Sequence, residues 1–157
     1  MCFYGRANVR ISQKCQYAVR AILELAKHGE TSPLPIGQIA EAQAIPPRFL
    51  ESILVELKQA GYVQSTRGVR GGYRLAASPK DLSVGDIVRL IDGPLDPVDC
   101  SSGAAARACP LKSRCALVAL WRRAKEAVEE VYDGATFEEL AAREQALERK
   151  TAADYCI

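Results

Sequence analysis

The stretch from Tyr62 to Ala76 constrains the fold of this chain more than any other, because the spacing of its apolar residues changes there. Residues 62–66 and 73–76 are typical of two short strands, and the intervening RGVRGG is typical of a tight glycine-rich turn. On both sides of this stretch, apolar residues recur every three or four positions, which indicates helices. The sequence therefore predicts a mainly α protein that carries one small β-hairpin.

Three helices are predicted ahead of the hairpin. Ser12 can cap the first helix, which ends at Gly29. The second helix is short, and its buried side consists of Ile36, Ile39 and Ala40. Pro46 and Pro47 open the third helix, since proline is tolerated in a first turn. Helix, short helix, longer helix and hairpin is the order found in a winged helix-turn-helix domain. We therefore expect the third helix to be a recognition helix for DNA and the hairpin to be the wing.

Three further helices are predicted after the hairpin. Ser83 and Asp86 form a variant capping box at the start of the first of these helices. A long helix is expected from about Pro110 to Tyr132, with Cys109 as its N-cap, and a last helix follows a capping box that begins at Thr136. The long helix carries more apolar surface than a small winged domain can cover. Pairing with the same helix of a second subunit would cover that surface, and packing back on its own domain is the alternative.

These patterns divide the chain into five parts. Residues 1–8 are expected to be an extension that is disordered or comes from a start codon chosen too early. A winged helix-turn-helix domain is expected at residues 9–92, and a cysteine-bearing loop at 93–110. Dimerisation helices are expected at residues 111–150, and a frayed tail at 151–157. A genuine flexible arm at residues 1–8 is the alternative for the first part.

Composition and charge exclude some classes of protein and favour others. The 157 residues are 48% apolar, but no apolar run approaches the roughly 20 residues of a membrane span, so no membrane association is expected. The first ten residues lack the apolar core of a secretion signal, which predicts a cytoplasmic protein. Residues 1–92 hold 12 Lys and Arg against 8 Asp and Glu, whereas residues 93–157 hold 9 against 11. A basic front half fits an anionic partner there, although it also fits a solvated surface.

Six cysteines are present, and three of them fall within residues 100–115. A reducing compartment disfavours disulfides, so clustered cysteines indicate metal or redox chemistry. Cys100, Cys109 and Cys115 follow a C-x8-C-x5-C spacing, and thiolates are soft ligands that suit iron–sulfur clusters and zinc. Unligated thiols are the alternative for this whole segment.

Several of these segments together resemble the IscR/NsrR/CymR family of dimeric winged-helix repressors, also called the Rrf-two type. The resemblance rests on the segments VRISQKCQYAVRAILELA, PPRFLESILVELKQAGYVQSTRGVRGGYRLA and LSVGDIVRLIDGP, and on the cysteine loop followed by LVALWRRAKEAVEEVYDGATFEEL. The resemblance covers residues 9–150, with Val9 at the place of the family's initial methionine. It implies a homodimer that binds double-stranded operator DNA and is not an enzyme.

Candidate DNA-binding residues come from the helix pattern and from this resemblance. Arg48, Glu51 and Ser52 lie opposite the apolar side of the third helix, where base edges are within reach. The resemblance implies that the positions of Arg48, Phe49, Glu51 and Ser52 read bases. Arg67 and Arg70 fall on the wing tip, where arginine can enter the minor groove or pair with a phosphate. Ser12 and Lys14, at the start of the first helix, are phosphate candidates. For Glu51 the alternative is a solvated helix charge. The wing glycines are interpreted as turn residues rather than as a nucleotide-binding loop.

The resemblance also implies an iron–sulfur cluster at Cys100, Cys109 and Cys115. IscR-like members place a histidine where this chain has Val118, and NsrR-like members place an aspartate where it has Gln16. Neither family ligand set is reproduced, so the cluster type, [4Fe–4S] or [2Fe–2S], stays open. The adjacent Cys15 of the other subunit is the candidate fourth ligand. A buried, small apolar residue is the alternative for Cys15, and His28 is interpreted as a helix C-terminal residue rather than a ligand.

Two rival functions remain at this stage. The segment IDGPLDPVDC and the tail from Leu120 onward are also similar to CymR-like members, which bind no cluster and respond to a partner enzyme of cysteine metabolism. A thiol oxidoreductase is disfavoured, because the chain has no CxxC motif. The leading prediction is a DNA-binding repressor whose affinity is controlled by an iron–sulfur cluster that senses iron, redox state or nitric oxide.

Overall fold

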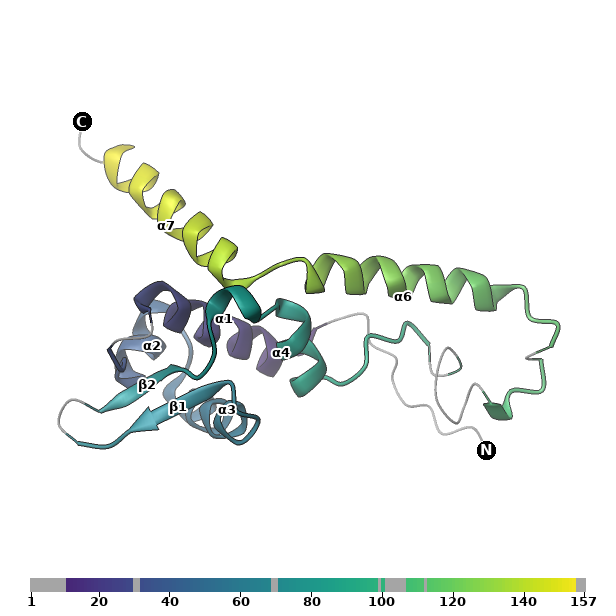
Figure 1. Cartoon of the computed structure of the whole chain (residues 1–157), viewed down its shortest axis with the longest axis horizontal. Helices are drawn as coiled ribbons and strands as arrows, with labels where there is room; N and C mark the ends of the chain where they lie inside the picture. The colour runs from purple at the N-terminus through teal and green to yellow at the C-terminus, as the bar shows by residue number, and fades with distance from the viewer. Residues whose placement is uncertain are drawn as a thin grey trace.

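The computed structural model describes residues 11–29, 32–68, 71–98, 100, 107–111 and 113–154 (Figure 1). The helices and strands follow one another as α1 (Gln13–His28), α2 (Ile36–Ala42), α3 (Pro47–Gln59), β1 (Val63–Thr66), β2 (Gly72–Leu75), the short 3-10 helix η1 (Pro79–Asp81), α4 (Val84–Ile91), α6 (Leu117–Asp133) and α7 (Phe137–Asp154). A mainly α protein with one antiparallel hairpin was predicted, and that prediction is confirmed.

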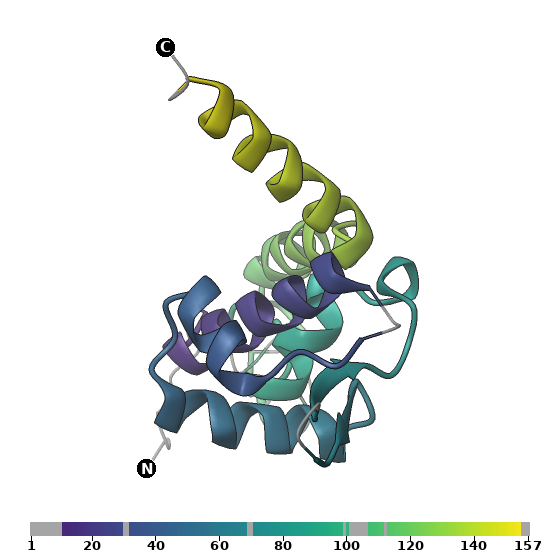
Figure 2. The ribbon, with the colours of Figure 1, turned by 90° about the vertical axis from the view of Figure 1, so that its left-hand side faces the viewer.

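The first three helices form the helix-turn-helix part of the fold. The Ser12 hydroxyl accepts a hydrogen bond from the Cys15 backbone N–H and so caps α1, as its sequence position predicts. Pro47 opens α3 at its first position. Between α2 and α3 the chain turns through Ala44, whose φ of 47° lies in the left-handed region. This turn lets the buried sides of both helices face α1 (Figure 2).

The hairpin lies beside this helical core. Val63 pairs with Leu75 and Thr66 with Gly72, and both Val63 and Leu75 are buried. Leu34, which precedes α2, exchanges two backbone hydrogen bonds with Tyr73, at 2.8 and 2.9 Å. A Cβ at Gly72 would lie 2.4 Å from the Leu34 carbonyl oxygen, so only glycine permits this close approach. The wing is therefore fixed to the domain at its base.

Two later segments complete the domain. Ser83 and Asp86 form the predicted capping box of α4, with hydrogen bonds in both directions. The chain at the start of α7 pairs with the chain before α4, since the Phe137 N–H donates to the Leu82 carbonyl at 3.0 Å. The Phe137 side chain is fully buried in the same core as α1 and α3. The beginning of α7 is therefore part of the packing of the winged domain.

Ion pairs of Lys27 join α7 to α1. The Lys27 ammonium lies 2.6 Å from the Glu148 carboxylate and 3.4 Å from that of Glu24, which is buried. Burial alone would lower the Lys27 pKa, but the hydrogen bond that Lys27 donates to Glu148 and the neighbouring carboxylates raise this pKa above its usual value. Gln43 donates to Glu24 at 2.7 Å, so the network also reaches the end of α2.

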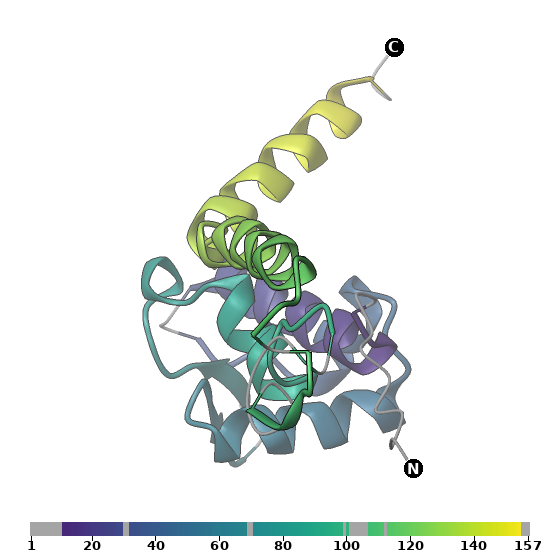
Figure 3. The same ribbon diagram turned by 90° about the vertical axis from the view of Figure 1, so that its right-hand side faces the viewer.

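In contrast, α6 lies along the outside of the domain (Figures 1 and 3). Arg89 of α4 donates two hydrogen bonds to the Asp133 carboxylate near the end of α6. Gly85 permits this pair, because a Cβ there would lie 1.9 Å from Asp133 Oδ1. One side of α6 packs towards α4, but no residue of the helix is fully buried. None of the helices in the described ranges is long and apolar enough to cross a membrane.

Candidate nucleic-acid interface and cysteine segment

The outer face of α3 presents the predicted base-reading residues. Leu50, Ile53, Leu54 and Leu57 are buried on the inner face. The opposite face exposes Arg48, Phe49, Glu51 and Ser52 to solvent. An exposed helix face of this kind fits the major groove, where guanidinium, carboxylate and hydroxyl groups recognise base edges. The structure thus brings these four candidates together on one surface.

The wing places Arg67 at its tip. Arg67 follows β1 and is exposed, and Gly68 beside it has a φ of 112°, which side chains disfavour. A Cβ at Gly71 would lie 2.4 Å from the Thr66 carbonyl oxygen. The glycines therefore serve the turn, as predicted. Arg70, the second wing candidate, lies outside the described residues.

The N-terminus of α1 already has carboxylate partners, which sequence reasoning did not predict. Ser12 donates from its N–H at 2.8 Å and from its hydroxyl at 2.5 Å to the Asp92 carboxylate at the end of α4. Lys14 forms an ion pair with Glu56 of α3 at 2.5 Å. A DNA phosphate would compete with these carboxylates for Ser12 and Lys14. Asp92 lies 80 positions from Ser12 in the chain, so no local motif could indicate the contact.

The long helix begins later than predicted. Pro110, Leu111, Ser113 and Arg114 lie in turns, with a hydrogen bond from the Arg114 N–H to the Leu111 carbonyl, and α6 starts at Leu117. Cys109 is therefore not the N-cap of α6, and Pro110 is not its first residue. The physical reason is that residues 110–116 offer no apolar side to pack, as Leu111 is itself exposed, and short helices depend on such packing.

The three loop cysteines lie outside the core. Cys100 is exposed, and Cys109 and Cys115 are partly buried, all as free thiols. Within the described ranges, no three Cys, His, Asp or Glu side chains lie close enough together to hold a metal ion. The donor set nevertheless suits a cluster, because the three thiols supply soft ligands and none of them is fully buried. Val118, where IscR-like proteins have a histidine, is exposed and offers no ligand atom.

Cys15 differs from the loop cysteines. Its side chain has 0% exposure. Burial, the negative charge of Asp92 and a hydrogen bond to that carboxylate raise the Cys15 pKa to about 12. A metal ligand must be a thiolate, which this environment disfavours. The geometry therefore favours the alternative role for Cys15, which is that of a small buried residue in the first turn of α1. His28 at the end of α1 contacts the Glu24 carbonyl through Nδ1 at 3.1 Å, which fits the predicted helix C-terminal role.

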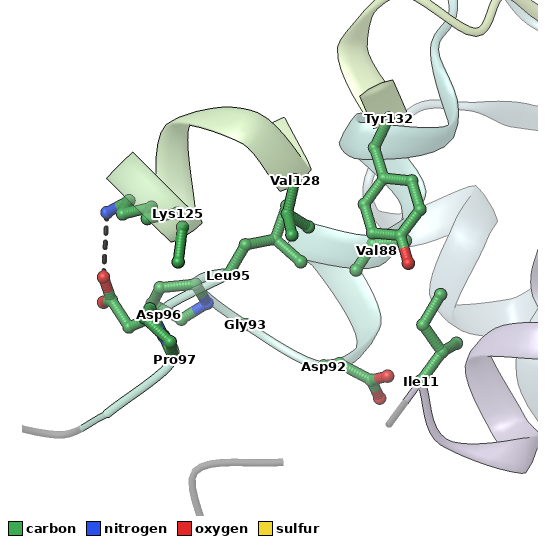
Figure 4. A pocket seen from close by; sticks show the side chains of 12 residues that line it. Ile11, Val88, Asp92, Gly93, Leu95, Asp96, Pro97, Lys125, Val128 and Tyr132 are labelled. Atoms are coloured by element: carbon green, nitrogen blue, oxygen red, sulfur yellow. Dashed lines mark ion pairs between the residues drawn. The ribbon is translucent and has the colours of Figure 1, made fainter. Parts of the chain in front are cut away.

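A cavity of about 160 Å³ lies where the cysteine segment leaves the winged domain (Figure 4). Its walls come from Ile11, the end of α4, residues 92–97 and the inner side of α6, including Val128 and Tyr132. Lys125 of α6 forms an ion pair with Asp96 at 2.9 Å. The chain leading to Cys100 is therefore held by α4 and α6 together, so a rearrangement of this segment would act on both helices.

The helix-turn-helix core, the exposed face of α3 and the attached wing define a winged-helix transcriptional regulator. Residues 11–143 match the family described as "Rrf2: Iron-dependent Transcriptional regulator". The chain belongs to the Rrf2 family.

Three relatives illustrate the range of this family. The transcriptional regulator IscR of Vibrio atlanticus is 34% identical over 140 residues, which cover 89% of this chain and 79% of that protein. The solved structure of CymR, the global cysteine regulator of B. subtilis, has a TM-score of 0.69 at 35% identity and covers 85% of this chain and 97% of that chain. The solved structure of T. potens IscR has a TM-score of 0.66 at 34% identity, with 87% and 90% covered. The chain is thus similar to regulators of both the IscR and the CymR type.

Proposed function

We propose that this protein is a dimeric, sequence-specific repressor whose affinity for operator DNA is controlled by an iron–sulfur cluster. The observation that carries the DNA-binding part is the exposed face of α3, with Arg48, Phe49, Glu51 and Ser52 beside the wing. Two such faces in a dimer match the two half-sites of an operator. A bacterial regulator of this kind works in the cytoplasm, where the DNA is. Selection of bound duplexes from a random pool tests the proposal, and it fails if no common motif is enriched.

Cys100, Cys109 and Cys115 would hold the cluster. When bound, such a cluster supplies a redox and ligand-exchange centre that responds to iron, oxidation or nitric oxide. A change at the cluster would reach α6 through the chain itself. Cys115 lies two positions before α6, and Cys100 follows the segment whose Asp96 forms an ion pair with Lys125 of α6. The fourth ligand is the Cys15 of the other subunit or an exogenous group. The high pKa of the Cys15 thiol makes it the weaker candidate.

The second candidate is a cluster-free regulator of the CymR type, gated by a partner enzyme of cysteine metabolism. The similarity to B. subtilis CymR over 85% of this chain favours it. The three loop cysteines favour the cluster instead, since CymR-like members carry none there. Iron and sulfide analysis of protein purified without oxygen distinguishes the two.

Replacing Arg67 by alanine is expected to weaken operator binding and to lower the salt dependence of binding by about one unit of slope, if Arg67 neutralises one phosphate. Titrations of labelled operator at several salt concentrations measure both quantities. Arg149→Ala is the matched control, because it removes an exposed arginine from the far part of α7. Unchanged affinity and slope in Arg67→Ala and Arg70→Ala would reject the wing contact.

Replacing Glu51 by alanine is expected to change sequence preference more than affinity. A carboxylate is repelled by phosphates but accepts a hydrogen bond from a cytosine amino group, so its loss relaxes discrimination at one base pair per half-site. Duplex selection with both proteins reveals the change. Glu41→Ala removes an exposed carboxylate from α2 and is expected to keep the motif. An identical motif for Glu51→Ala and the native protein would defeat the prediction.

A further inference from the structure

Phe49 is the one large apolar side chain among the four candidate base-reading residues of α3. Its side chain is 60% exposed in the first turn of α3, on the face that also carries Arg48 and Glu51. Its backbone is fixed, because its N–H donates to the Pro46 carbonyl at 3.0 Å and its carbonyl accepts from the Ser52 hydroxyl at 2.9 Å. An exposed aromatic ring on the face that carries the candidate base-reading groups is available for contact with DNA.

A second ring supports Phe49 from below. The centroid of the Tyr17 ring lies 6.3 Å from that of Phe49, and the two planes are tilted by 48°, a favourable arrangement for an aromatic pair. Tyr17 is partly buried against the core. Its hydroxyl accepts a hydrogen bond of 2.9 Å from the Gln13 side chain. The Tyr17 ring, held by Gln13 one turn earlier in α1, thus limits the rotamers that the Phe49 side chain can adopt.

The chemistry of the major groove decides what such a ring can recognise. Base edges there are polar, with one apolar exception, which is the 5-methyl group of thymine. Arg48, Glu51 and Ser52 on the same exposed face offer polar contacts, so Phe49 is placed to take the apolar one. A protein partner would also take an exposed ring, but this ring stands in the turn that faces base edges.

We propose that Phe49 recognises a thymine methyl in each half-site and that Tyr17 is the positioning residue that presents it. This inference rests on the proposed DNA-binding function and adds a specificity determinant that includes α1. Removal of one buried methyl group typically weakens binding by about threefold to fivefold. The pair therefore contributes to discrimination among sequences more than to overall affinity.

The test uses the full-length protein and the operator found by selection. Each thymine is replaced in turn by deoxyuridine, which lacks only the methyl group, and dissociation constants are measured. The native protein is expected to lose about threefold to fivefold in affinity at one thymine per half-site. Phe49→Ala should bind thymine and uracil operators equally. Tyr17→Ala should lose most of the uracil penalty, whereas Tyr17→Phe, which keeps the ring, should retain it.

Controls keep the outcomes distinct. If Tyr17→Ala does not fold, as judged by circular dichroism, Tyr17→Leu fills the same apolar site without a ring and should also lose the penalty. A native protein indifferent to every uracil, or a full penalty in Phe49→Ala, would overturn the thymine contact. A full penalty in Tyr17→Ala or Tyr17→Leu would overturn the positioning role. Failure of the native protein to select any operator would instead reject the proposed function itself.

Discussion

Protein purified without oxygen is expected to contain iron and sulfide in stoichiometric amounts and to show the visible absorption of an iron–sulfur cluster. Replacing any one of Cys100, Cys109 and Cys115 by serine should abolish it, because the loop offers no spare thiol and a serine hydroxyl is a poor substitute for a soft ligand. Metal analysis and absorption spectra of the three variants measure the loss. Cys156→Ser, which changes a thiol outside the loop, should retain the cluster.

Loss of the cluster should also change operator affinity. The segment before Cys100 packs between α4 and α6, so its rearrangement can alter the spacing of two recognition helices in a dimer. A tenfold difference between the two forms corresponds to a coupling of about 1.4 kcal/mol, a usual size for such linkage. Colourless native protein that binds its operator as well as the triple serine variant would contradict the prediction and favour the CymR-type alternative.

Cys15→Ser addresses the fourth ligand separately. The buried, protonated state of this thiol leads us to expect a retained cluster, with a small loss of stability from the altered contact to Asp92. Loss of the cluster in a variant that is otherwise folded would assign Cys15 as a ligand.

The winged domain could be predicted from sequence because its signals are local. The capping side chains of Ser12 and Ser83 stand next to the helices they begin, and the apolar spacing of α3 indicates which face is buried. The hairpin follows from one glycine-rich turn. The same local logic placed Arg48, Glu51 and Ser52 on the exposed side of α3, where the structure has them.

The remaining features depend on contacts between distant segments. The burial of Phe137 in the winged core, the Asp92 carboxylate at Ser12 and the pairing of Lys14 with Glu56 join elements far apart in the chain. The start of α6 was predicted too early for a related reason. Proline after a potential cap is a local signal for a helix, but the helix forms only where its apolar side finds a surface to pack on.

In a single chain, part of the apolar side of α6 has no surface to pack on. Its replacement by charge is expected to have the largest effect of any substitution away from the cysteine loop. Leu117, Leu120 and Val131 lie along one side of α6 and are 51%, 52% and 67% exposed. We call these three residues the α6 stripe. They fall within about 60° of one another round the helix, next to the side of α6 that faces α4, and they remain exposed. An exposed apolar stripe on a helix is typical of a subunit interface, so we propose that a second copy covers it.

Leu120→Asp is therefore expected to convert the dimer into monomers and to abolish operator binding at ordinary protein concentrations. Burying a carboxylate without a partner costs about 3 kcal/mol or more, which weakens dimerisation by at least about 100-fold. Analytical ultracentrifugation and operator titration measure the two effects. Ala119→Asp adds the same charge to an exposed position about 100° or more from each member of the stripe, and it should leave both unchanged. A Leu120→Asp variant that sediments as the native protein does would place the dimer interface elsewhere.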